Sequence, residues 1–377
     1  MRHDIKIKTR VFFITVITIA TFIIIILGCG PESGEKDAEK PDETTGESDF
    51  QYNVTADIED FPEDTMEIVT LSLPVYDKDY AAETALRFGL SGTVEEINGV
   101  YSIKDGKSVY SLDSLTGIEN FGNPEAGKWD NIEEPQIPSE EEATGIAIEF
   151  INSLRESGSR EIKEGLYSKS LLIVKPDTAI KVRELEASTT ALVPVQVNEI
   201  MRSAVEVNDE LEPGKEIINA QVVSRTVVFN KYYLGKPVFV GPGSRVSVTI
   251  GHNGKVLRFN ANWFPISTEE SRAVKVIEGE KAVKALETKL RKADTKNTIK
   301  NVNVKAMFPG YISATVDGEY TLVPAYYFDC ESEFENDNVF SFSEIIVAAP
   351  ELEGKIEMGF DIPVPDPPKP IKEKPGE

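Results

Sequence analysis

The chain has 377 residues, a net charge of −24 at pH 7 and a hydrophobic fraction of 40%. This fraction supplies enough apolar residues for folded cores, and the length favours two or three domains. An acidic excess of this size excludes binding of nucleic acid or anionic lipid through the overall field of the protein, so we expect no nucleic-acid partner.

The first thirty residues have the layout of a secretory signal. A basic start precedes an apolar run from Val11 to Leu27, and Gly28 stands directly before Cys29. This arrangement resembles the lipobox of exported lipoproteins, in which the signal is cut before a cysteine that carries a lipid. The resemblance implies a signal peptide over residues 1–28, a lipid such as palmitate attached at Cys29, and a body on the extracytoplasmic face of the cell membrane. The alternative is an uncleaved membrane anchor. The apolar run is about long enough for this, because a membrane-spanning helix needs roughly 17–25 residues.

Cleavage would make the chain more acidic and would leave one further cysteine. Residues 1–28 carry four basic side chains and one acidic one, so their removal changes the net charge from −24 to about −27. If Cys29 is lipidated, Cys330 has no partner within the chain, which excludes a disulfide framework. Cys330 ends a strand-like aromatic run, and we expect a buried, unreactive thiol there.

Both ends of the remaining chain have the composition of linkers. Residues 29–64 are rich in acidic residues, glycine, proline, serine and threonine. We expect a disordered tether there, with an average reach of about 30 Å. Residues 351–377 close with repeated prolines, which favour an extended polyproline tail.

Between these tails the sequence repeats a short helix followed by a series of strands. Residues 65–123 predict a small β-α-β-β domain, and residues 138–266 predict a helix followed by an antiparallel sheet. Ser139 and Glu142 have the spacing of a capping box at the start of that helix. Residues 267–350 predict a second module of the same kind. We therefore expect an α+β fold of repeated helix-plus-antiparallel-meander modules.

One hairpin is predicted in more detail. The pair Asn253-Gly254 is a strong signal for a two-residue turn in which both residues have positive φ. In the strand that follows, we expect Phe259 to point inward. Its expected partners are Val283 and Leu286, on the helix of the last module.

The sequence offers little for catalysis. After cleavage His252 is the only histidine, and it stands at the predicted turn. Histidine-dependent nucleophilic catalysis needs that ring beside a nucleophile, and zinc sites favour several histidine or cysteine ligands. We therefore expect a non-catalytic protein without metal or cofactor. Two alternatives stay open: a hydrolase of envelope glycans that uses a pair of carboxylates, and a structural spacer of the envelope, suggested by the tether and the tail.

Aromatic side chains are the remaining candidates for a binding role. Most of them fit the packing of half-buried strands. Tyr233 and Trp263 each stand beside a predicted strand end, where a ring can also contact a ligand. We take these two as candidate binding residues.

Residues 217–290 carry the features of a known module. These features are the run Tyr233-Leu234-Gly235-Lys236-Pro237-Val238, the alternating strand Val246-Ser247-Val248-Thr249-Ile250, and the turn Asn253-Gly254. Together they resemble the PepSY and thermolysin-propeptide modules, of the cystatin-like kind. The plan of helix and meander is also similar to YycI/YycH-type extracytoplasmic regulators of sensor kinases. The resemblance implies no catalytic residue and a role in regulating a neighbouring protein. We expect the partner to be an envelope protein, or a peptide added along a sheet edge.

Overall fold

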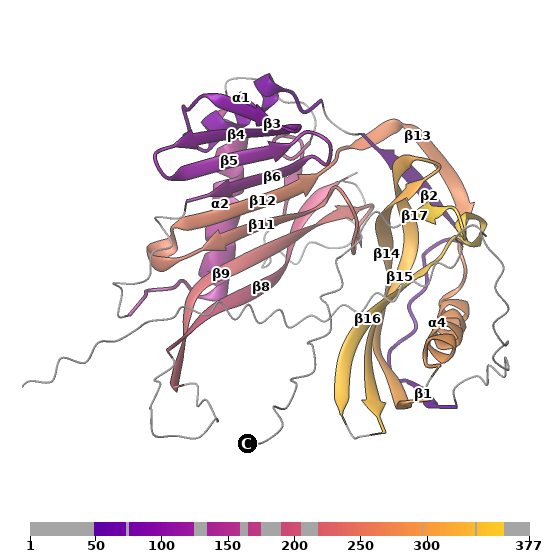
Figure 1. Cartoon of the computed structure of the whole chain (residues 1–377). Coiled ribbons are helices and arrows are strands. Elements are labelled where there is room, and N and C mark those ends of the chain that lie inside the picture. The colour runs from indigo at the N-terminus through magenta and orange to yellow at the C-terminus, as the bar shows by residue number, and fades with distance from the viewer. Residues whose placement is uncertain are drawn as a thin grey trace, which may run out of the picture.

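Two β-sheets and three α-helices make up the described part of the chain in the computed structural model (Figure 1). The structure describes residues 49–72, 75–123, 134–158, 165–174, 190–204, 218–295, 297–335 and 338–357. The expected signal peptide, Cys29 and the proline-rich end of the tail lie outside these residues.

The larger sheet has ten strands in the order β3-β4-β5-β6-β12-β11-β9-β8-β7, and β10 pairs with β9. Neighbouring strands are antiparallel except β7 and β8, which are parallel. The bounds are β3 Val94–Ile97, β4 Val100–Asp105, β5 Ser108–Asp113, β6 Ile118–Gly122, β7 Leu172–Ile173, β8 Ala191–Ala204, β9 Ile218–Tyr233, β10 Lys236–Pro237, β11 Ser244–Ile250 and β12 Val256–Trp263.

The smaller sheet has seven strands in the order β1-β14-β15-β2-β13, with β16 beside β15 and β17 beside β14. Strand β1 runs parallel to β14, and the other pairs are antiparallel. The bounds are β1 Gln51–Val54, β2 Thr65–Leu71, β13 Ile266–Lys275, β14 Ile299–Val316, β15 Glu319–Phe334, β16 Val339–Val347 and β17 Ile356–Glu357.

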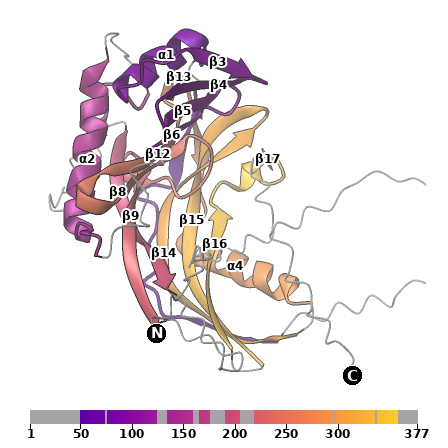
Figure 2. The same cartoon turned by 60° about the vertical axis from the view of Figure 1, so that its left-hand side comes forward.

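The helices lie on opposite sides of the molecule (Figure 2). Helices α1 (Lys78–Arg87) and α2 (Glu140–Ser157) cover one face of the larger sheet, and α4 (Gly279–Ala293) packs on the smaller sheet. The start of α2 follows the sequence prediction. The Ser139 hydroxyl accepts the N–H of Glu142, and the Glu142 carboxylate accepts the N–H of Ser139, which together form the capping box.

The core of the larger sheet lies under α2. Val246, Val248 and Ile250 alternate along β11 and are all fully buried against this helix, because every second residue of a strand faces the same side. Phe259 on β12 also points inward, as predicted, and its ring centroid lies 6.0 Å from that of Phe150 on α2.

The expected partner of Phe259 was wrong. Val283 and Leu286 belong to α4 and are buried in the separate core of the smaller sheet, among strands β14 and β15. Helical and strand periodicity mark which face of an element is apolar. They do not say which of two apolar helices covers that face.

The expected α+β fold of repeated helix-plus-meander modules is wrong. Strands predominate over helices, and strands from different expected modules pair within common sheets. Phe121 of β6 lies opposite Phe259 of β12, while β2 leaves its sequence neighbours and pairs with β13 and β15. The physical reason is that local signals fix strands and turns, whereas the pairing of sheet edges depends on contacts between distant segments.

The two sheets share a core at one end. The chain crosses from β12 to β13 through Phe264 and Pro265, and the segment after β10 pairs with β14. In that pairing the N–H of Phe239 donates to the Tyr311 carbonyl at 2.8 Å, and the N–H of Ser313 donates to the Val240 carbonyl at 2.8 Å. Buried side chains from both sheets meet here in one apolar cluster, so the sheets are joined by packing as well as by the chain.

Candidate functional site

Tyr233, the first aromatic candidate, is buried where the two sheets join. Its ring meets the edge of the Tyr311 ring with centroids 5.3 Å apart. Its hydroxyl donates to a carboxylate oxygen of Glu67 at 3.4 Å. Burial is the main cause that raises the pKa of Tyr233 to about 12. The residue therefore bridges β9 of the larger sheet and β14 of the smaller sheet.

Trp263, the second candidate, is also buried, and it lies beside a buried lysine. The Lys231 Nζ atom lies 4.6 Å from the centroid of the Trp263 ring and donates a hydrogen bond to the carbonyl of Phe264. Burial lowers the pKa of Lys231 to about 7, because an ammonium group loses its water there. The ring and the carbonyl replace part of that lost hydration.

A second buried ionisable group lies on β6. The Glu119 carboxylate accepts hydrogen bonds from the hydroxyls of Tyr80 at 2.8 Å and Tyr167 at 2.6 Å. Burial raises the pKa of Glu119, and the hydrogen bonds from Tyr167 and Tyr80 oppose this rise. Arg87 lies over the Tyr167 ring at 5.2 Å. The cluster joins β6, α1 and the segment 165–174 inside the core.

Cys330 is fully buried under α4, as the sequence predicted. Burial is the largest cause that raises the pKa of its thiol to about 12. A thiol that stays protonated is a poor nucleophile, so this cysteine is part of the core.

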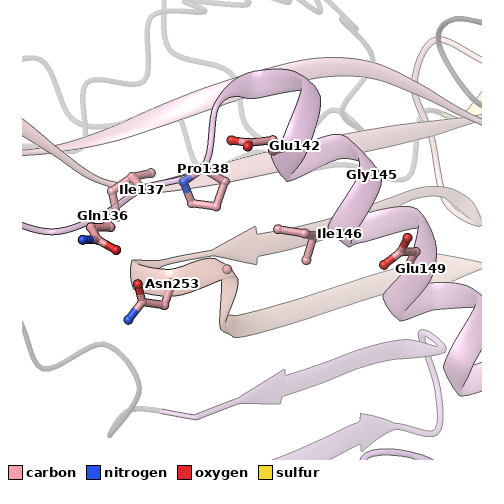
Figure 3. A pocket seen from close by; sticks show the side chains of 9 residues that line it. Gln136, Ile137, Pro138, Glu142, Gly145, Ile146, Glu149 and Asn253 are labelled. Atoms are coloured by element: carbon pink, nitrogen blue, oxygen red, sulfur yellow. The ribbon is translucent and has the colours of Figure 1, made fainter.

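An open hollow lies beside the start of α2 and has a volume of about 490 Å³ (Figure 3). Glu142, Ile146 and Glu149 of α2 line one side, and the turn Asn253-Gly254 between β11 and β12 lines the other. Gly254 keeps the turn clear of the helix, because a Cβ atom there would lie 3.0 Å from the Ile146 side chain. Asn253 and Gly254 have φ values of 55° and 72°, which confirms the predicted turn.

His252 holds one wall of this hollow in place. Its Nδ1 atom accepts the backbone N–H of Gln136 at 2.9 Å, and the Gln136 carbonyl accepts the N–H of Asn253 at 2.9 Å. Two hydrogen bonds therefore fasten the segment before α2 to the β11–β12 turn. This gives the histidine a structural role.

The chemistry of the hollow is that of hydrogen-bond acceptors. The Glu142 carboxylate accepts the backbone N–H of Ser139, and this bond is the first cause that lowers its pKa. A glycosidase acid needs a raised pKa, so Glu142 does not supply that group. Sequence reasoning missed the hollow because its walls come from segments more than 100 residues apart. The capping box was its single local sign.

A second surface feature is the outer edge of β8. Within the described residues, β7 contacts this edge only through the pairs Leu172↔Ala191 and Ile173↔Leu192, and the Val174 N–H donates to Leu192. Farther along β8 the exposed apolar side chains are Val195 at 44%, Ile200 at 38% and Met201 at 47%. Exposed apolar edge strands are sites where another strand can add.

Neither a membrane-spanning helix nor a metal site is found in the part of the chain that the structure describes. None of its helices is both long enough and apolar enough to cross a bilayer. No group of three or more histidine, cysteine, aspartate or glutamate side chains there is placed to hold a metal ion.

Comparison with protein-family models finds no match, and comparison with curated proteins finds none either. Among solved structures, the chain is similar to an uncharacterized protein from Eubacterium rectale, with 10% sequence identity. The match covers 81% of this chain and 90% of that protein, with a TM-score of 0.42. A likeness of this size carries no argument about function.

Proposed function

We propose that the chain is a lipid-anchored extracytoplasmic binding protein that captures an extended segment of an envelope protein along the outer edge of β8. The role is regulatory and non-catalytic. The observation that carries the proposal is the row of exposed apolar side chains on β8, beyond the two residues that pair with β7. The Gly28-Cys29 site supports the anchor, and the resemblance of the motifs in residues 217–290 to PepSY modules supports the regulatory role.

The β8 edge suits strand addition because it is long and carries little charge. An added strand gains backbone hydrogen bonds along the edge, and alternate side chains supply specificity. Proteins usually protect such edges with charged residues or proline. On β8 the residues of this kind are Pro194, Arg202 and Glu199. The Glu199 carboxylate is 2.6 Å from Arg225 of the neighbouring strand. Val195 lies at a register shift, where a bulge turns a side chain outward.

The test is a photo-crosslinker placed at Ile200 in the full chain in cells, with the same crosslinker at Leu115 as a control. Leu115 is an exposed leucine in the turn between β5 and β6. We expect one discrete protein adduct at Ile200 that is absent at Leu115. Met201→Lys should weaken that adduct, because a charge on an edge opposes strand addition. Equal adduct patterns at both positions would refute the proposal.

The anchor is tested separately. Cys29→Ala should abolish labelling of the protein by radioactive fatty acid and release it from the membrane, because the modified thiol is lost. Undiminished labelling of this variant would exclude Cys29 as the lipid site. The crosslinking result at Ile200 does not depend on this outcome.

A further inference from the structure

The outer edge of β16 is a free strand edge. The strand spans nine residues and pairs with β15 on one side, and among the described residues no strand pairs with its other side (Figure 1). Two hydrogen bonds frame its pairing with β15. The N–H of Phe334 donates to the Asn338 carbonyl, and the N–H of Ala348 donates to the Pro324 carbonyl, each at 2.9 Å. Between these bonds the register is continuous.

These two bonds determine which residues of β16 have free backbone groups. In an antiparallel pair, every second residue bonds to the partner strand, and the residues between them point their N–H and C=O groups away from it. Asn338 and Ala348 belong to the bonded set, so the even-numbered residues of β16 bond to β15. The groups that point outward belong to Val339, Ser341, Ser343, Ile345 and Val347. An added strand can bond to these groups.

The β16 edge lacks the usual protection against an added strand. Proteins place lysine, proline or bulges on exposed edges, and β16 contains neither lysine nor proline. Its single charged residue, Glu344, is buried against α4, where its carboxylate is 2.6 Å from the Lys289 Nζ atom. The pairing of β8, in contrast, is interrupted by shifts in register. The β16 edge is therefore the more regular of the two.

Side chains on an added strand would alternate between the two faces of the smaller sheet. Phe342 points to the face that α4 covers, and Phe340 shares this face because it lies two residues away. Phe340 is 55% exposed, and its ring meets the edge of the Phe334 ring with centroids 5.5 Å apart. Every second side chain of an added strand would therefore lie beside α4 and the rings of Phe340 and Phe342.

Helix α4 gives this edge a positive charge. The Lys289 Nζ atom contacts Glu344, so this side of the helix faces β16. Lys292 follows three residues later on the same side. It is exposed, and no ion pair of Lys292 is found among the described residues. The acidic Glu287 lies on the side nearer β1, where it pairs with Arg291.

Lys292 lies level with the first half of β16. The start of α4 is near the end of this strand, since the N–H of Ile277 donates to the carbonyl of the residue after β16. The contact between Lys289 and Glu344 is the next one, so the helix runs opposite to the strand. Three further helical residues rise about 4.5 Å, and two strand residues span about 6.6 Å. Lys292 is therefore near the level of Phe342.

We propose that the outer edge of β16 binds an extended segment of a partner protein that places an acidic side chain against Lys292. The backbone of this segment bonds to the free groups of β16, and its apolar side chains cover Phe340 and Phe342. A second copy of this chain fits less well. Two-fold pairing of β16 with itself would bring two α4 helices to one face, and the single carboxylate of β16 is already bonded to Lys289.

The first test uses a fluorescent seven-residue peptide that alternates threonine with valine and has glutamate at its centre. A matched peptide has lysine at its centre instead. Binding to the full chain is measured by fluorescence polarisation at physiological ionic strength. We expect the glutamate peptide to bind about fivefold more tightly, since an exposed ion pair replaces a repulsion. Equal affinities, or tighter binding of the lysine peptide, would overturn the proposal.

Lys292→Glu tests the ionic contact. The preference should reverse in this variant, so that the lysine peptide binds more tightly by about the same factor. Lys284→Glu is the matched control, because Lys284 is also exposed on α4 and lies on the side of Glu287. It changes the net charge equally and should leave the preference unchanged. An equal reversal in both variants would show an effect of net charge alone and would sink the proposal.

Ser341→Pro tests the strand edge. The proline removes an outward N–H that the pairing of β15 with β16 does not use. We expect the glutamate peptide to bind about tenfold more weakly or worse, and Ser341→Ala to keep its affinity.

A modified peptide tests the same bonds without changing the protein. Every second N–H of an added strand points toward β16. N-methylation of one alternate set of peptide nitrogens should therefore abolish binding, and N-methylation of the other set should preserve it. Equal effects of the two modifications would exclude strand addition at this edge.

This site goes beyond the proposed function, since it lies on the other sheet from β8 and does not need the lipid anchor. Met201→Lys should leave peptide binding unchanged, and Ser341→Pro should leave the Ile200 adduct unchanged, so either proposal can fail alone. Loss of peptide binding in Met201→Lys would place the peptide on β8 and overturn the inference. A dimer of the full chain in sedimentation that Ser341→Pro dissociates would show a second copy on β16, which also overturns it.

Discussion

Glu119 and Lys231 are both buried in the larger sheet, but their surroundings differ. Glu119 accepts two tyrosine hydroxyls, whereas the described polar contacts of the Lys231 ammonium are one carbonyl and one aromatic ring. The difference shows in the causes of their pKa shifts. Hydrogen bonds oppose the effect of burial on the pKa of Glu119, whereas burial lowers the pKa of Lys231 without such opposition. A buried charge is tolerated according to the number of partners that replace its water.

The largest expected effect comes from removing the lysine charge. A shift of the Lys231 pKa from 10.5 to about 7 corresponds to about 5 kcal/mol against the charged form. Lys231→Met leaves the Phe264 carbonyl without this donor, which costs about 1–3 kcal/mol. We expect the free energy of unfolding near pH 7 to rise by about 2–4 kcal/mol, measured in urea. A loss of stability would show that the lysine contacts outweigh its desolvation.

The pH dependence sharpens this prediction. The Lys231 pKa is lower in the folded state than in the unfolded state, so between about pH 7 and pH 10.5 the unfolded chain binds more protons. The contribution of this residue to stability is greatest above that window and falls as the pH drops toward 7. Lys231→Met should remove this part of the pH dependence. Arg258→Ala, an exposed change on β12, is the control and should keep it.

The next effect comes from removing a partner of Glu119. Tyr167→Phe deletes a hydroxyl that donates to the carboxylate, and hydrogen bonds to charged groups contribute about 1.5–3 kcal/mol. We expect a loss of about 2 kcal/mol. Folding raises the pKa of Glu119. Its contribution to the free energy of unfolding is therefore fully present below the pKa that it has in the unfolded chain, and is lost as the pH rises through its pKa in the folded protein. The variant should raise that pKa further, and urea unfolding should show a greater loss at high pH. A loss that does not change with pH would contradict the charged contact.

A smaller effect is expected at the β11–β12 turn. Gly254→Val places a β-branched residue at positive φ, with its Cβ atom 3.0 Å from Ile146. We expect a loss of about 1–3 kcal/mol in urea unfolding. Gly106→Val is the control, because it also has positive φ but has no neighbour within 4 Å. If the two variants lose equal stability, backbone strain alone explains the loss, and the close approach of residue 254 to Ile146 does not contribute to it.

The smallest effect is expected at His252. Replacement by alanine removes the acceptor for the Gln136 N–H, which costs about 1 kcal/mol for an exposed neutral hydrogen bond. Binding at β8 should stay unchanged, as should any activity. A loss of activity by a factor of about 10³ or more would indicate a catalytic base, and would contradict the structural role of this residue.

Local features of the fold could be predicted from the sequence. The capping box of Ser139 and the turn at Asn253-Gly254 depend on a few neighbouring residues, and both form as predicted. The pairing of β2 with β13 could not be predicted, because it joins segments about 200 residues apart. The exposed edge of β8 could not be predicted either, because the local sequence does not show which strand lies at the end of a sheet.

Lys231 shows where a sequence signal was available. It lies on the same face of β9 as Val227, Phe229 and Tyr233, which are all buried. This spacing predicts that the Lys231 side chain points into the core. A lysine at such a position is unusual. Its partner, the Phe264 carbonyl, lies beyond another strand and could not be inferred from spacing.

The parallel pairing of β1 with β14 determines how the body carries mechanical load. A pull on the residues before Gln51 acts along the axis of β1, so the hydrogen bonds of this ladder are sheared together instead of opening one after another. Two further bonds, from the N–H groups of Thr55 and Ala56 to the Val304 carbonyl, lie on the same line. Force from an anchor would enter β14 first. From there it would pass into the larger sheet through the hydrogen bond between the Phe239 N–H and the Tyr311 carbonyl.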